Sequence, residues 1–447
     1  MTGPQLAHHP RSLSANEVPR LLSGLDTSGT PVGLDEHLAR WGPVSFRHAG
    51  TSLIDDLEAS GLAGHGGAWF PVGVKWRSVR SGLLKRPVVV ANAAEGEPAS
   101  SKDELLVARL PHLVLDGASA AGAALGAGRV IVHAPRHLLA GLDRAVLERR
   151  RRSVDPVDIE VMEAADTFIA GQETAVVNAL NRKLPLPTFV GIDPIRTRGV
   201  GGRPTLVQNV ETLAHVALVA RFGPDWFRGL GTAMAPGTML MTLHGLGPGP
   251  RIVEAPLGMR LGDVLGLSAD EARHYWGVLL GGYGGGWLPM DRALELRLDE
   301  AEARRQGSSL GAGVVALVPA GVCPLAETAR VVAYLDEQKA GQCGPCINGL
   351  GELAALCTAL AVQPSTLRGR VQPLLDVCAL VEGRGACRHP DGATRVVRSA
   401  LEVFGHEVQA HLRGGPCAHV GAPTVLPGLE RFGLGRAGAA RDRRGRS

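Results

Sequence analysis

The chain has little lysine, no long apolar run and no internal repeat. Its 447 residues hold five lysines among 47 basic residues, so arginine supplies nearly all of the positive charge. No run of about 18 consecutive apolar residues occurs, and the N-terminus lacks the apolar core of a signal peptide. We therefore expect a cytoplasmic protein with no membrane span.

The charge balance gives no sign of a nucleic-acid partner. The formal net charge is +4, and residues 431–447 alone carry six arginines against one aspartate, which leaves the rest of the chain close to neutral. A short basic terminus of this kind is more often solvated than bound to nucleic acid or to a membrane surface. We expect residues 426–447 to form a basic, disordered tail.

The first half of the chain alternates strand-like and helix-like segments. The β-branched run RPVVVANA begins at Arg86 and is followed by an Ala/Leu-rich stretch, then by RVIVHA, a second helical stretch and DIEVMEA. This alternation predicts βαβ units and a Rossmann-like α/β domain, in which ligands bind beyond the carboxyl ends of the strands. We place this domain at residues 43–232, after an N-terminal extension at residues 1–42.

The second half predicts two further domains. TMLMTLHG and RIVEAPLG flank GPGP as in a hairpin, and LGDVLGL follows as a short helix, which indicates a small α+β domain at residues 233–322. Between residues 323 and 425, apolar residues recur at spacings of three and four in four segments. That pattern predicts a four-helix bundle.

The stretch GHGGAWFPVGVKW, residues 64–76, gathers glycines and aromatic residues around one lysine. Glycines let backbone amides approach a phosphate or a planar ring, and a lysine supplies a point charge for a phosphate. The alternative is a tight irregular turn. Lys75 is lysine in a chain with 42 arginines, and a compact ammonium suits a crowded phosphate site better than a guanidinium does.

Three further stretches make the pattern specific. They are ANAAEGEPASSKDELLVARLPHLVLDG (91–117), FIAGQETAVVNAL (168–180) and GRPTLVQNVETLAHV (202–216). With the glycine loop, and in this order, they resemble the NADH-oxidising flavoprotein subunit of respiratory complex I and its relatives in NAD-linked hydrogenases and formate dehydrogenases. The resemblance extends from about residue 43 to about residue 412. It implies an FMN-binding α/β domain, a ubiquitin-like middle domain of the SLBB type, and a helical bundle with a 4Fe-4S cluster.

The resemblance also implies the binding residues. The FMN pocket would consist of Gly64, Gly66, Gly67, Lys75, Asn92, Glu95, Gly171, Glu173, Asn209 and Thr212. NADH would lie over the flavin, with Phe70 stacking on its adenine and Glu97 bonding its sugar. Because hydride transfer is then the chemistry of the cofactor, no acid or base residue is expected.

The chain departs from the family pattern at several of these sites. The differing positions are Ala63, His65, Trp69, Ser78, Ala94, Gln172, Gly201 and Gln208. At Ser78 and Gly201 the family has aromatic residues, so two of three rings around the dinucleotide are missing. A base–aromatic contact is typically worth about 1–3 kcal/mol, which predicts weaker NADH binding. Trp69 either replaces a lost ring or fills the nicotinamide site.

The seven cysteines are clustered toward the C-terminus. In a reducing compartment, such clustering favours metal or thiol chemistry over disulfides. Cys343, Cys346 and Cys387 fall on the last three cluster positions of the family, whereas the first is Ala340. One iron of a 4Fe-4S cluster would then need a non-cysteine ligand such as water, Glu337 or His389, or a different cysteine. The alternative is a relic pocket with Zn²⁺ or no metal. We expect Cys323, Cys357 and Cys378 to be structural.

Two functional hypotheses follow. The first is an oxidoreductase subunit that transfers electrons from NADH, or another donor, through FMN and an iron-sulfur cluster to a partner such as a ferredoxin or another redox subunit. The second is a catalytically impaired paralogue that acts as a binding or scaffold subunit of a redox assembly. The substitutions at Ala94, Gln172, Gly201 and Ala340 are compatible with both.

Overall fold

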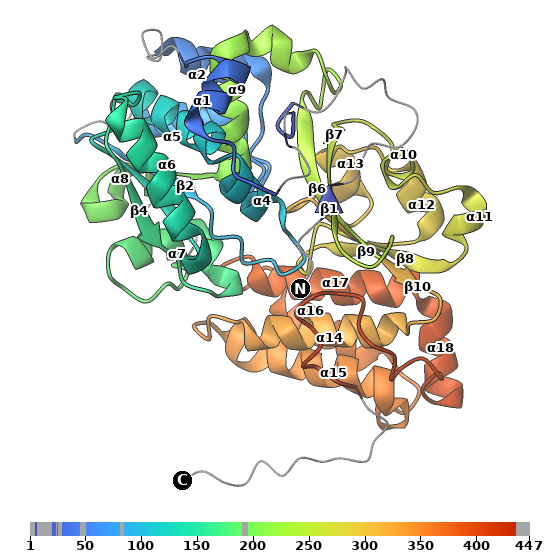
Figure 1. Ribbon diagram of the computed structural model, residues 1–447. Helices are drawn as coiled ribbons and strands as arrows, with labels where there is room; N and C mark the ends of the chain where they lie inside the picture. Colours follow the sequence, from blue (N-terminus) through green and yellow to red (C-terminus); the bar gives the residue numbers. More distant parts are fainter. Residues whose placement is uncertain are drawn as a thin grey trace.

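The computed structural model describes residues 5–6, 20–23, 25, 29–44, 51–80, 85–189 and 195–434. These residues form an α/β domain, a middle domain built on a mixed sheet, and a helical domain, and the three meet at one junction (Figure 1). Half of the expected N-terminal extension, residues 1–42, lies outside the described residues. Its described part includes one helix, α1 (Leu34–Trp41).

The first domain contains a parallel sheet with the strand order β4-β3-β2-β5. The strands are β2 (Val88–Asn92), β3 (Arg129–Ala134), β4 (Ile159–Glu163) and β5 (Thr205–Asn209). β2 is rich in valine, which suits a buried pleated strand, and it lies between β3 and β5 with Asn92 aligned to His133 and Asn209. The α/β prediction with a parallel sheet is thereby confirmed.

Helices surround this sheet (Figure 1). They are α2 (Thr51–Ser60), α3 (Val72–Arg80), α4 (Lys102–Arg109), α5 (Pro111–Leu125), α6 (Leu139–Arg151), α7 (Glu173–Leu180), α8 (Ile195–Arg198) and α9 (Val210–Arg228). α5 begins with a proline in its first turn and ends at Gly126 in the left-handed conformation, as expected for these residues at helix ends. Gly117 in α5 allows the helix to approach the backbone of α9 at Leu213.

The middle domain contains a six-stranded mixed sheet with the order β1-β7-β6-β10-β8-β9. The strands are β1 (Gln5–Leu6), β6 (Thr238–His244), β7 (Arg251–Pro256), β8 (Tyr275–Leu280), β9 (Gly286–Leu288) and β10 (Val314–Pro319). β6 and β7 form the expected antiparallel hairpin. Four short helices belong to this domain: α10 (Leu261–Leu265), α11 (Ala269–Ala272), α12 (Met290–Glu295) and α13 (Glu300–Arg305).

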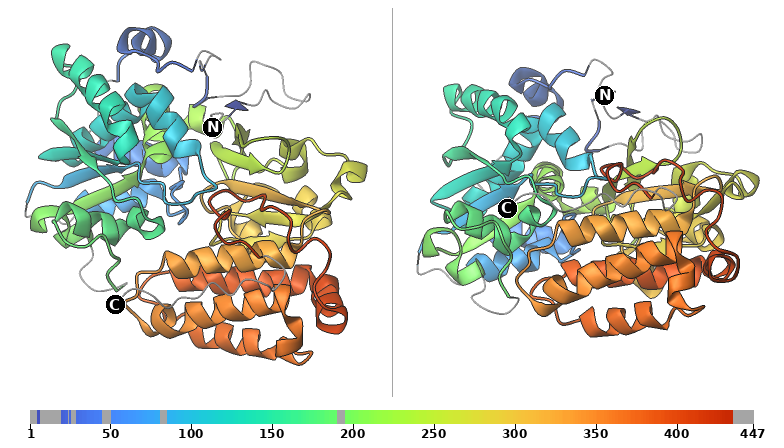
Figure 2. Two further views of the ribbon diagram at one scale, coloured as in Figure 1. Left: turned by 60° about the horizontal axis from the view of Figure 1, so that its bottom comes forward. Right: turned by 90° about the horizontal axis from the view of Figure 1, so that it is seen from below.

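The third domain is helical. It lies below the other two domains in Figure 1 and comes to the front when the molecule is turned toward a view from below (Figure 2). Its helices are α14 (Pro324–Glu337), α15 (Leu350–Val362), α16 (Gln372–Val381), α17 (His389–Val403) and α18 (Gly405–Gly414). The fourth segment expected from the sequence is divided in two because the helix ends at Phe404, whose buried ring packs edge-on against Trp287 of the middle domain. The described part of this domain therefore has five α-helices.

The expected disordered tail begins later than residue 426. Leu426 and Leu429 are buried in the core of the helical domain, and Arg431 forms two hydrogen bonds with the carboxylate of Glu337. The sequence-based boundary was wrong for residues 426–434 because two leucines inside this stretch bury their side chains on the bundle. Residues 435–447 lie outside the described part of the chain.

Among the residues that the structure describes, one helical run has the length and composition of a membrane span. Residues Pro345–Val362, a π-turn continued by α15, have a mean hydropathy of 1.4, and a third of the run is buried. It contains Asn348, Glu352 and Thr358, so a search for consecutive apolar residues passes over it. The run packs against α14 and α16. A core helix of a globular protein has the same composition, so this single run is weak evidence for a membrane span.

Gly117→Ala is expected to destabilise the protein. An added Cβ would overlap the Leu213 carbonyl, so α5 and α9 would have to separate, at a cost of about 1–3 kcal/mol or more. Gly141→Ala is the matched control, because nothing lies within 4 Å of a Cβ at this position in α6. That change is expected to raise the free energy of unfolding by about 0.4–1 kcal/mol. Urea unfolding of both variants tests the pair, and equal effects would contradict the packing argument.

Candidate functional site

The carboxyl edge of the parallel sheet brings several predicted site residues together. Asn92 ends β2, Asn209 ends β5, and Glu173 and Thr212 lie in the first turns of α7 and α9. The backbone amides at a helix N-terminus attract anions, and ligands of open α/β sheets bind at this edge. The sheet register therefore places side chains from four segments at the position where a cofactor phosphate is expected.

The glycine loop closes on itself and is fixed to α9. The Gly64 amide donates to the Phe70 carbonyl at 2.9 Å, and the His65 amide donates to the Thr212 hydroxyl at 2.9 Å. A Cβ at Gly66 would lie 3.1 Å from the Cβ of Asn209, and Gly67 has a φ of +98°. Both positions thus need glycine, one for close approach to α9 and one for its backbone conformation.

Lys75 faces this edge from α3. Its ammonium donates to the Val207 carbonyl at 2.6 Å and pairs with the Glu173 carboxylate at 2.8 Å, while 26% of the side chain stays exposed. An ammonium has three N–H donors, so one remains for a ligand. The structure therefore brings together two predicted FMN residues, Lys75 and Glu173, from segments about a hundred positions apart in the sequence.

Asn92 and Asn209 use their side chains to shape the edge. The Asn92 amide donates to the Gly171 carbonyl at 2.9 Å and its oxygen accepts from the Ala94 amide. Asn209 is the N-cap of α9, where its oxygen accepts from the first helical amides. A Cβ at Gly171 would overlap the Ala94 carbonyl. Gly171 is therefore required for the close approach of two loops, whether or not it also contacts a cofactor.

A buried charge network beneath the loop was missed by the sequence analysis. Lys102 is fully buried and pairs with Asp103 and Glu211, both at 2.8 Å. Asp103 also accepts a hydrogen bond of 2.6 Å from Asn209. Burial raises the pKa of Glu95, the neighbouring Asp103 raises it further, and Lys102 opposes the shift. The available signal was Lys102 itself, one of only five lysines.

His65, at a position where the family has arginine, lies in this buried region. Its ring centroid is 5.0 Å from that of His215. Burial, with a contribution from Lys102, lowers the pKa of His65 to about 3, and burial and His65 lower the pKa of His215 to about 3. Both rings are therefore neutral at physiological pH. Glu211 lies beside them, but its carboxylate is already neutralised by Lys102, which disfavours a metal ion here.

Trp69 makes packing contacts that the sequence did not indicate. Its indole N–H donates to the Gly311 carbonyl at 3.1 Å, and its ring packs against the core of the middle domain. The ring also makes an edge-on contact with His65. Trp69 has a positive φ of 54°, an uncommon conformation for a bulky residue. It thus connects the glycine loop to the middle domain.

The two predicted NADH residues differ in accessibility. Phe70 is 52% exposed, so its ring is open to stacking. Glu97 is 8% exposed, and its oxygens accept hydrogen bonds from the Tyr283 amide at 2.8 Å and the Ala99 amide at 3.3 Å. Burial raises the pKa of Glu97 to about 7 against the opposing effect of these amides. Since a carboxylate oxygen accepts more than one hydrogen bond, sugar binding at Glu97 stays a prediction.

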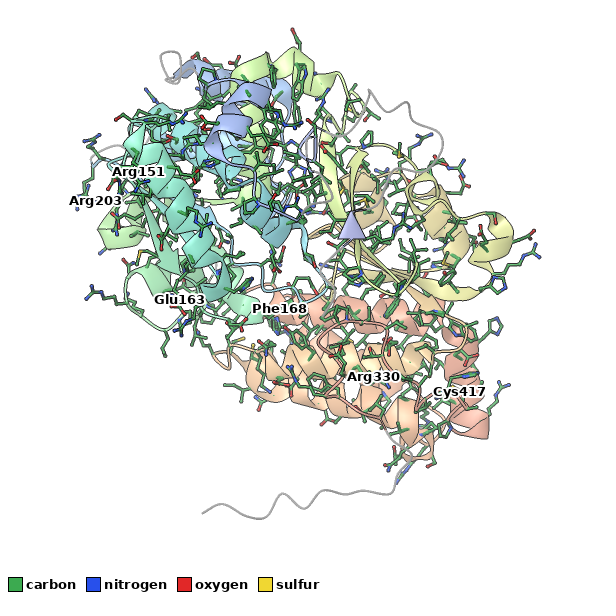
Figure 3. The ribbon with its side chains drawn as sticks, viewed as in Figure 1. Arg151, Glu163, Phe168, Arg203, Arg330 and Cys417 are labelled. Atoms are coloured by element: carbon green, nitrogen blue, oxygen red, sulfur yellow. The ribbon has the colours of Figure 1, made fainter. Side chains whose placement is uncertain are left out.

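A cavity of about 1030 Å³ lies where the three domains meet. Its lining includes Gly67 and Ala68 of the glycine loop, Gln172 at the start of α7, and Cys387 and His389 of the helical domain. Phe168, which also lines it, lies at the border between the α/β and helical domains (Figure 3). The volume suits a cofactor-sized ligand. The glycine loop and Cys387 thus line the same cavity.

The three predicted cluster cysteines are buried close together. Burial raises the pKa of Cys346 to about 11, and the neighbouring Cys343 and Cys387 thiols add to this effect. Cys346 lies in the π-turn before α15, and Cys387 precedes α17. Cys357 and Cys378 are buried within α15 and α16. Three thiols in one buried place provide the soft ligands that iron-sulfur clusters use.

Comparison with known proteins matches the α/β domain and the helical domain to two separate family models. Residues 57–218 match the family model described as the Nuo51 FMN-binding domain, and residues 326–411 match the NADH-ubiquinone oxidoreductase-F iron-sulfur binding region. An F-type NADH-quinone oxidoreductase subunit of Mycobacterium tuberculosis (strain ATCC 25618 / H37Rv) is 30% identical over 390 residues, which cover 82% of this chain and 85% of the relative.

Two further matches extend over more of the chain. The second F-type NADH-quinone oxidoreductase subunit of Rhizobium meliloti (strain 1021) is 28% identical over 412 residues, covering 89% of this chain and 96% of the relative. The crystal structure of an NAD⁺-reducing [NiFe]-hydrogenase in the air-oxidized state superposes with a TM-score of 0.76 at 27% identity, covering 89% of this chain and 67% of that chain.

A glycine loop at the edge of a parallel sheet, which shares a cavity with one of three buried thiols, is an arrangement that suits an electron-transfer flavoprotein with an iron-sulfur centre. The matches identify the protein family within that class. This chain belongs to the family of F-type NADH-quinone oxidoreductase subunits, the NADH-oxidising subunits of complex I and NAD-linked hydrogenases, whose domains bind FMN and a 4Fe-4S cluster.

Lys75→Ala is expected to weaken FMN binding by about 10- to 100-fold, because a hydrogen bond to a charged group is worth about 1.5–3 kcal/mol. Lys183→Ala is the control, since Lys183 is an exposed lysine outside the site. Flavin fluorescence after ultrafiltration measures the FMN that each folded variant retains. Full retention in Lys75→Ala would refute the phosphate role of this side chain.

Proposed function

We propose that this chain is the electron-input subunit of a multisubunit redox assembly. It binds NADH, or another donor, and transfers electrons to a redox partner such as a ferredoxin or another redox subunit. The observation that supports this most directly is the cavity shared by the glycine loop and Cys387, because electron transfer needs the flavin and the cluster to be close. FMN, when bound, supplies the conversion of two-electron hydride chemistry into single-electron steps.

Residues of the α/β domain would hold FMN. The loop glycines 64, 66 and 67 present backbone close to the ligand, and Lys75 offers its remaining N–H to the phosphate. Asn92, Glu95, Gly171, Glu173, Asn209 and Thr212 would complete the pocket at the sheet edge. The donor set fits a phosphate because it combines one cation with two helix N-termini.

Phe70 would stack on the adenine of the donor, and Glu97 would bond its sugar by sharing its carboxylate with the Tyr283 amide. Neither residue transfers a proton in this proposal. The missing aromatic rings at Ser78 and Gly201 would appear as weaker donor binding, not as a slower hydride step.

In the helical domain, Cys343, Cys346 and Cys387 would hold three irons of the cluster. Of the alternatives for the fourth, His389 is better placed than Glu337. The His389 Nε2 donates to the Leu335 carbonyl at 2.7 Å, and its buried Nδ1 has no hydrogen-bond partner among the described residues. Glu337, in contrast, is engaged by Arg431. A histidine whose other nitrogen donates to a carbonyl has the tautomer of a metal ligand.

The finer assignments of the other domains belong to the same proposal. The mixed sheet and short helices of the middle domain support a ubiquitin-like domain of the SLBB type. The packing of Pro345–Val362 within the helical domain supports a subunit that works in the cytoplasm without a membrane span. We take residues 43–232, 233–322 and 323–434 as the approximate limits of the three domains, because residues 426–434 pack on the helical domain.

The scaffold alternative is favoured by one observation, the engagement of Glu97 with two backbone amides. Other residues that differ from the family pattern make contacts within the fold, and these contacts do not distinguish the two hypotheses. Gln172, for instance, is the N-cap of α7 and accepts hydrogen bonds from the Thr174 and Ala175 amides. A catalytically impaired paralogue would keep these contacts and lose only the ability to bind the electron donor.

Anaerobically purified protein is expected to contain FMN and iron, and its flavin absorbance is expected to bleach on addition of NADH. The measurement is a visible spectrum with flavin and iron analysis before and after NADH. Flavin that dithionite reduces but NADH and NADPH do not would point to another donor. A protein that binds neither cofactor on reconstitution would overturn the proposal and favour the scaffold alternative.

Ala340→Cys is expected to raise the iron content and the resistance of the cluster to oxygen, because four thiolates complete the usual ligand set. His389→Ala is expected to lower the iron content of the natural chain and to have little effect in the Ala340→Cys background. Iron and sulfide analysis with electron paramagnetic resonance measures all four proteins. An equal loss of iron from His389→Ala in both backgrounds would exclude His389 as the fourth ligand.

A further inference from the structure

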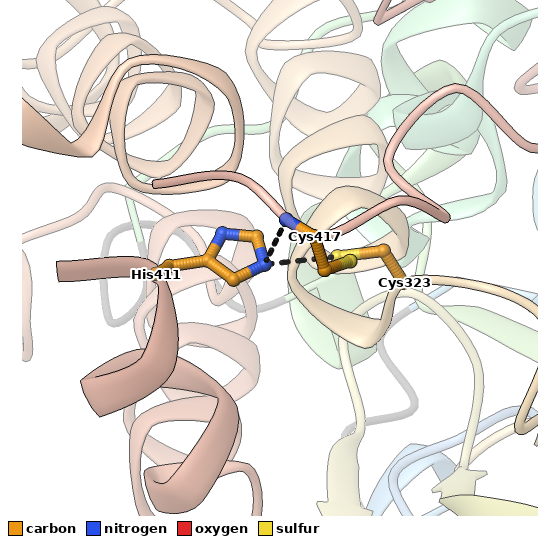
Figure 4. Close-up of side chains that lie close together, drawn as sticks. All are labelled: Cys323, His411 and Cys417. Carbon is orange, nitrogen blue, oxygen red and sulfur yellow. Dashed lines mark hydrogen bonds between the residues drawn. The ribbon is translucent and has the colours of Figure 1, made fainter. Parts of the chain in front are cut away.

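A second group of metal-ligand residues lies at the far end of the helical domain. Cys323 precedes α14, His411 lies in the last turn of α18, and Cys417 follows α18. The two Sγ atoms and one imidazole nitrogen all lie within 4.8 Å of one another (Figure 4). The sequence analysis treated Cys323 as an isolated structural residue, because residues 88 positions apart in the sequence show no ligand spacing.

The imidazole of His411 is oriented as in a metal site. Its Nδ1 lies 3.2 Å from the Leu360 carbonyl, which can only accept a hydrogen bond, so this nitrogen carries the proton. The lone pair of Nε2 therefore accepts a hydrogen bond from the Cys417 backbone amide at 3.2 Å and lies 3.8 Å from the Sγ of Cys323, so a metal ion bound by Nε2 would take the place of this amide proton. Metal-bound histidines almost always donate their other N–H in this way.

The thiol of Cys323 is also prepared for coordination. It lies at the N-cap of α14, close to the backbone amides of the first helical turn. Such donors and the helix N-terminus stabilise a thiolate.

We propose that Cys323, His411 and Cys417 bind one zinc ion, with water as the fourth ligand. Two thiolates and one imidazole are a donor set typical of zinc. Cys417 is partly exposed, which gives the ion and the water a path to the site. On binding, the two thiols lose their protons to solvent, so zinc affinity should increase with pH.

This site is separate from the proposed iron-sulfur site. Cys323 precedes α14 and Cys343 follows it, and a helix of fourteen residues is about 21 Å long. Cys323 and Cys417 also lie outside the residues 326–411 that match the iron-sulfur family model.

The ion would fix the segment that follows α18 to the bundle. Within this segment, the Thr424 hydroxyl and the Val425 amide both donate to the buried Glu327 carboxylate. Further along, the Pro427 carbonyl accepts a 2.5 Å hydrogen bond from the Tyr283 hydroxyl of the middle domain. Zinc would therefore stabilise the C-terminal segment, and with it the contact between the helical and middle domains.

The test is the metal content of the full-length protein, purified anaerobically and dialysed against a weak chelator. We expect inductively coupled plasma mass spectrometry to find one zinc ion per chain. Cys417→Ser should weaken zinc binding by more than about tenfold, whereas Cys417→His should retain the ion because imidazole replaces thiolate as a ligand. Cys378→Ser and Cys346→Ser are the controls, and the second should lose iron but keep zinc.

A second measurement distinguishes the loss of a metal ligand from misfolding of the variant. Cobalt added to the zinc-free natural protein should give a thiolate-to-cobalt charge-transfer band that Cys417→Ser lacks while its circular dichroism is unchanged. A protein that takes up no zinc on reconstitution, or that keeps it in Cys417→Ser, would overturn the proposal. A Cys323–Cys417 disulfide in the anaerobically purified protein would also overturn it and would assign a redox role to the pair.

Discussion

The structure depends on the attachment of the glycine loop to the N-terminus of α9. The His65 amide donates to Thr212, and Gly66 packs directly on Asn209, so the loop conformation and the helix start determine each other. Asn209 in turn bonds Asp103, which pairs with Lys102. A cofactor cradle, a helix cap and a buried ion pair thus form one connected unit.

The charges of that unit can be buried because they are paired. An isolated buried ammonium would be strongly disfavoured, but Lys102 has two carboxylate partners, and one of them, Glu211, also accepts the Leu240 amide of the middle domain. The neutral histidines beside it add no charge. Lys102 therefore supplies the positive charge of this buried region, and His65 adds none.

The three domains are joined by contacts close to the cavity. Trp69 bonds Gly311, Glu97 bonds the Tyr283 amide, and the Phe168 amide donates to Gln338 of the helical domain. Because these contacts surround the space that the glycine loop and Cys387 share, domain packing and site geometry are coupled. Trp69, whose ring packs on the middle domain, belongs to this junction.

The sequence by itself determined the parallel α/β sheet and the family, because both depend on periodicity, glycine content and motifs in a fixed order, whereas the roles of the glycine loop and of the three cluster cysteines stay predictions. It did not determine the extent of the tail, the fate of Trp69, the engagement of Glu97, the burial of Lys102 or the meeting of Cys323 with His411 and Cys417. Each of these depends on which side chains lie opposite one another after the domains pack. Only the tertiary structure decides such contacts between residues far apart in the chain, since they leave no local pattern in the sequence.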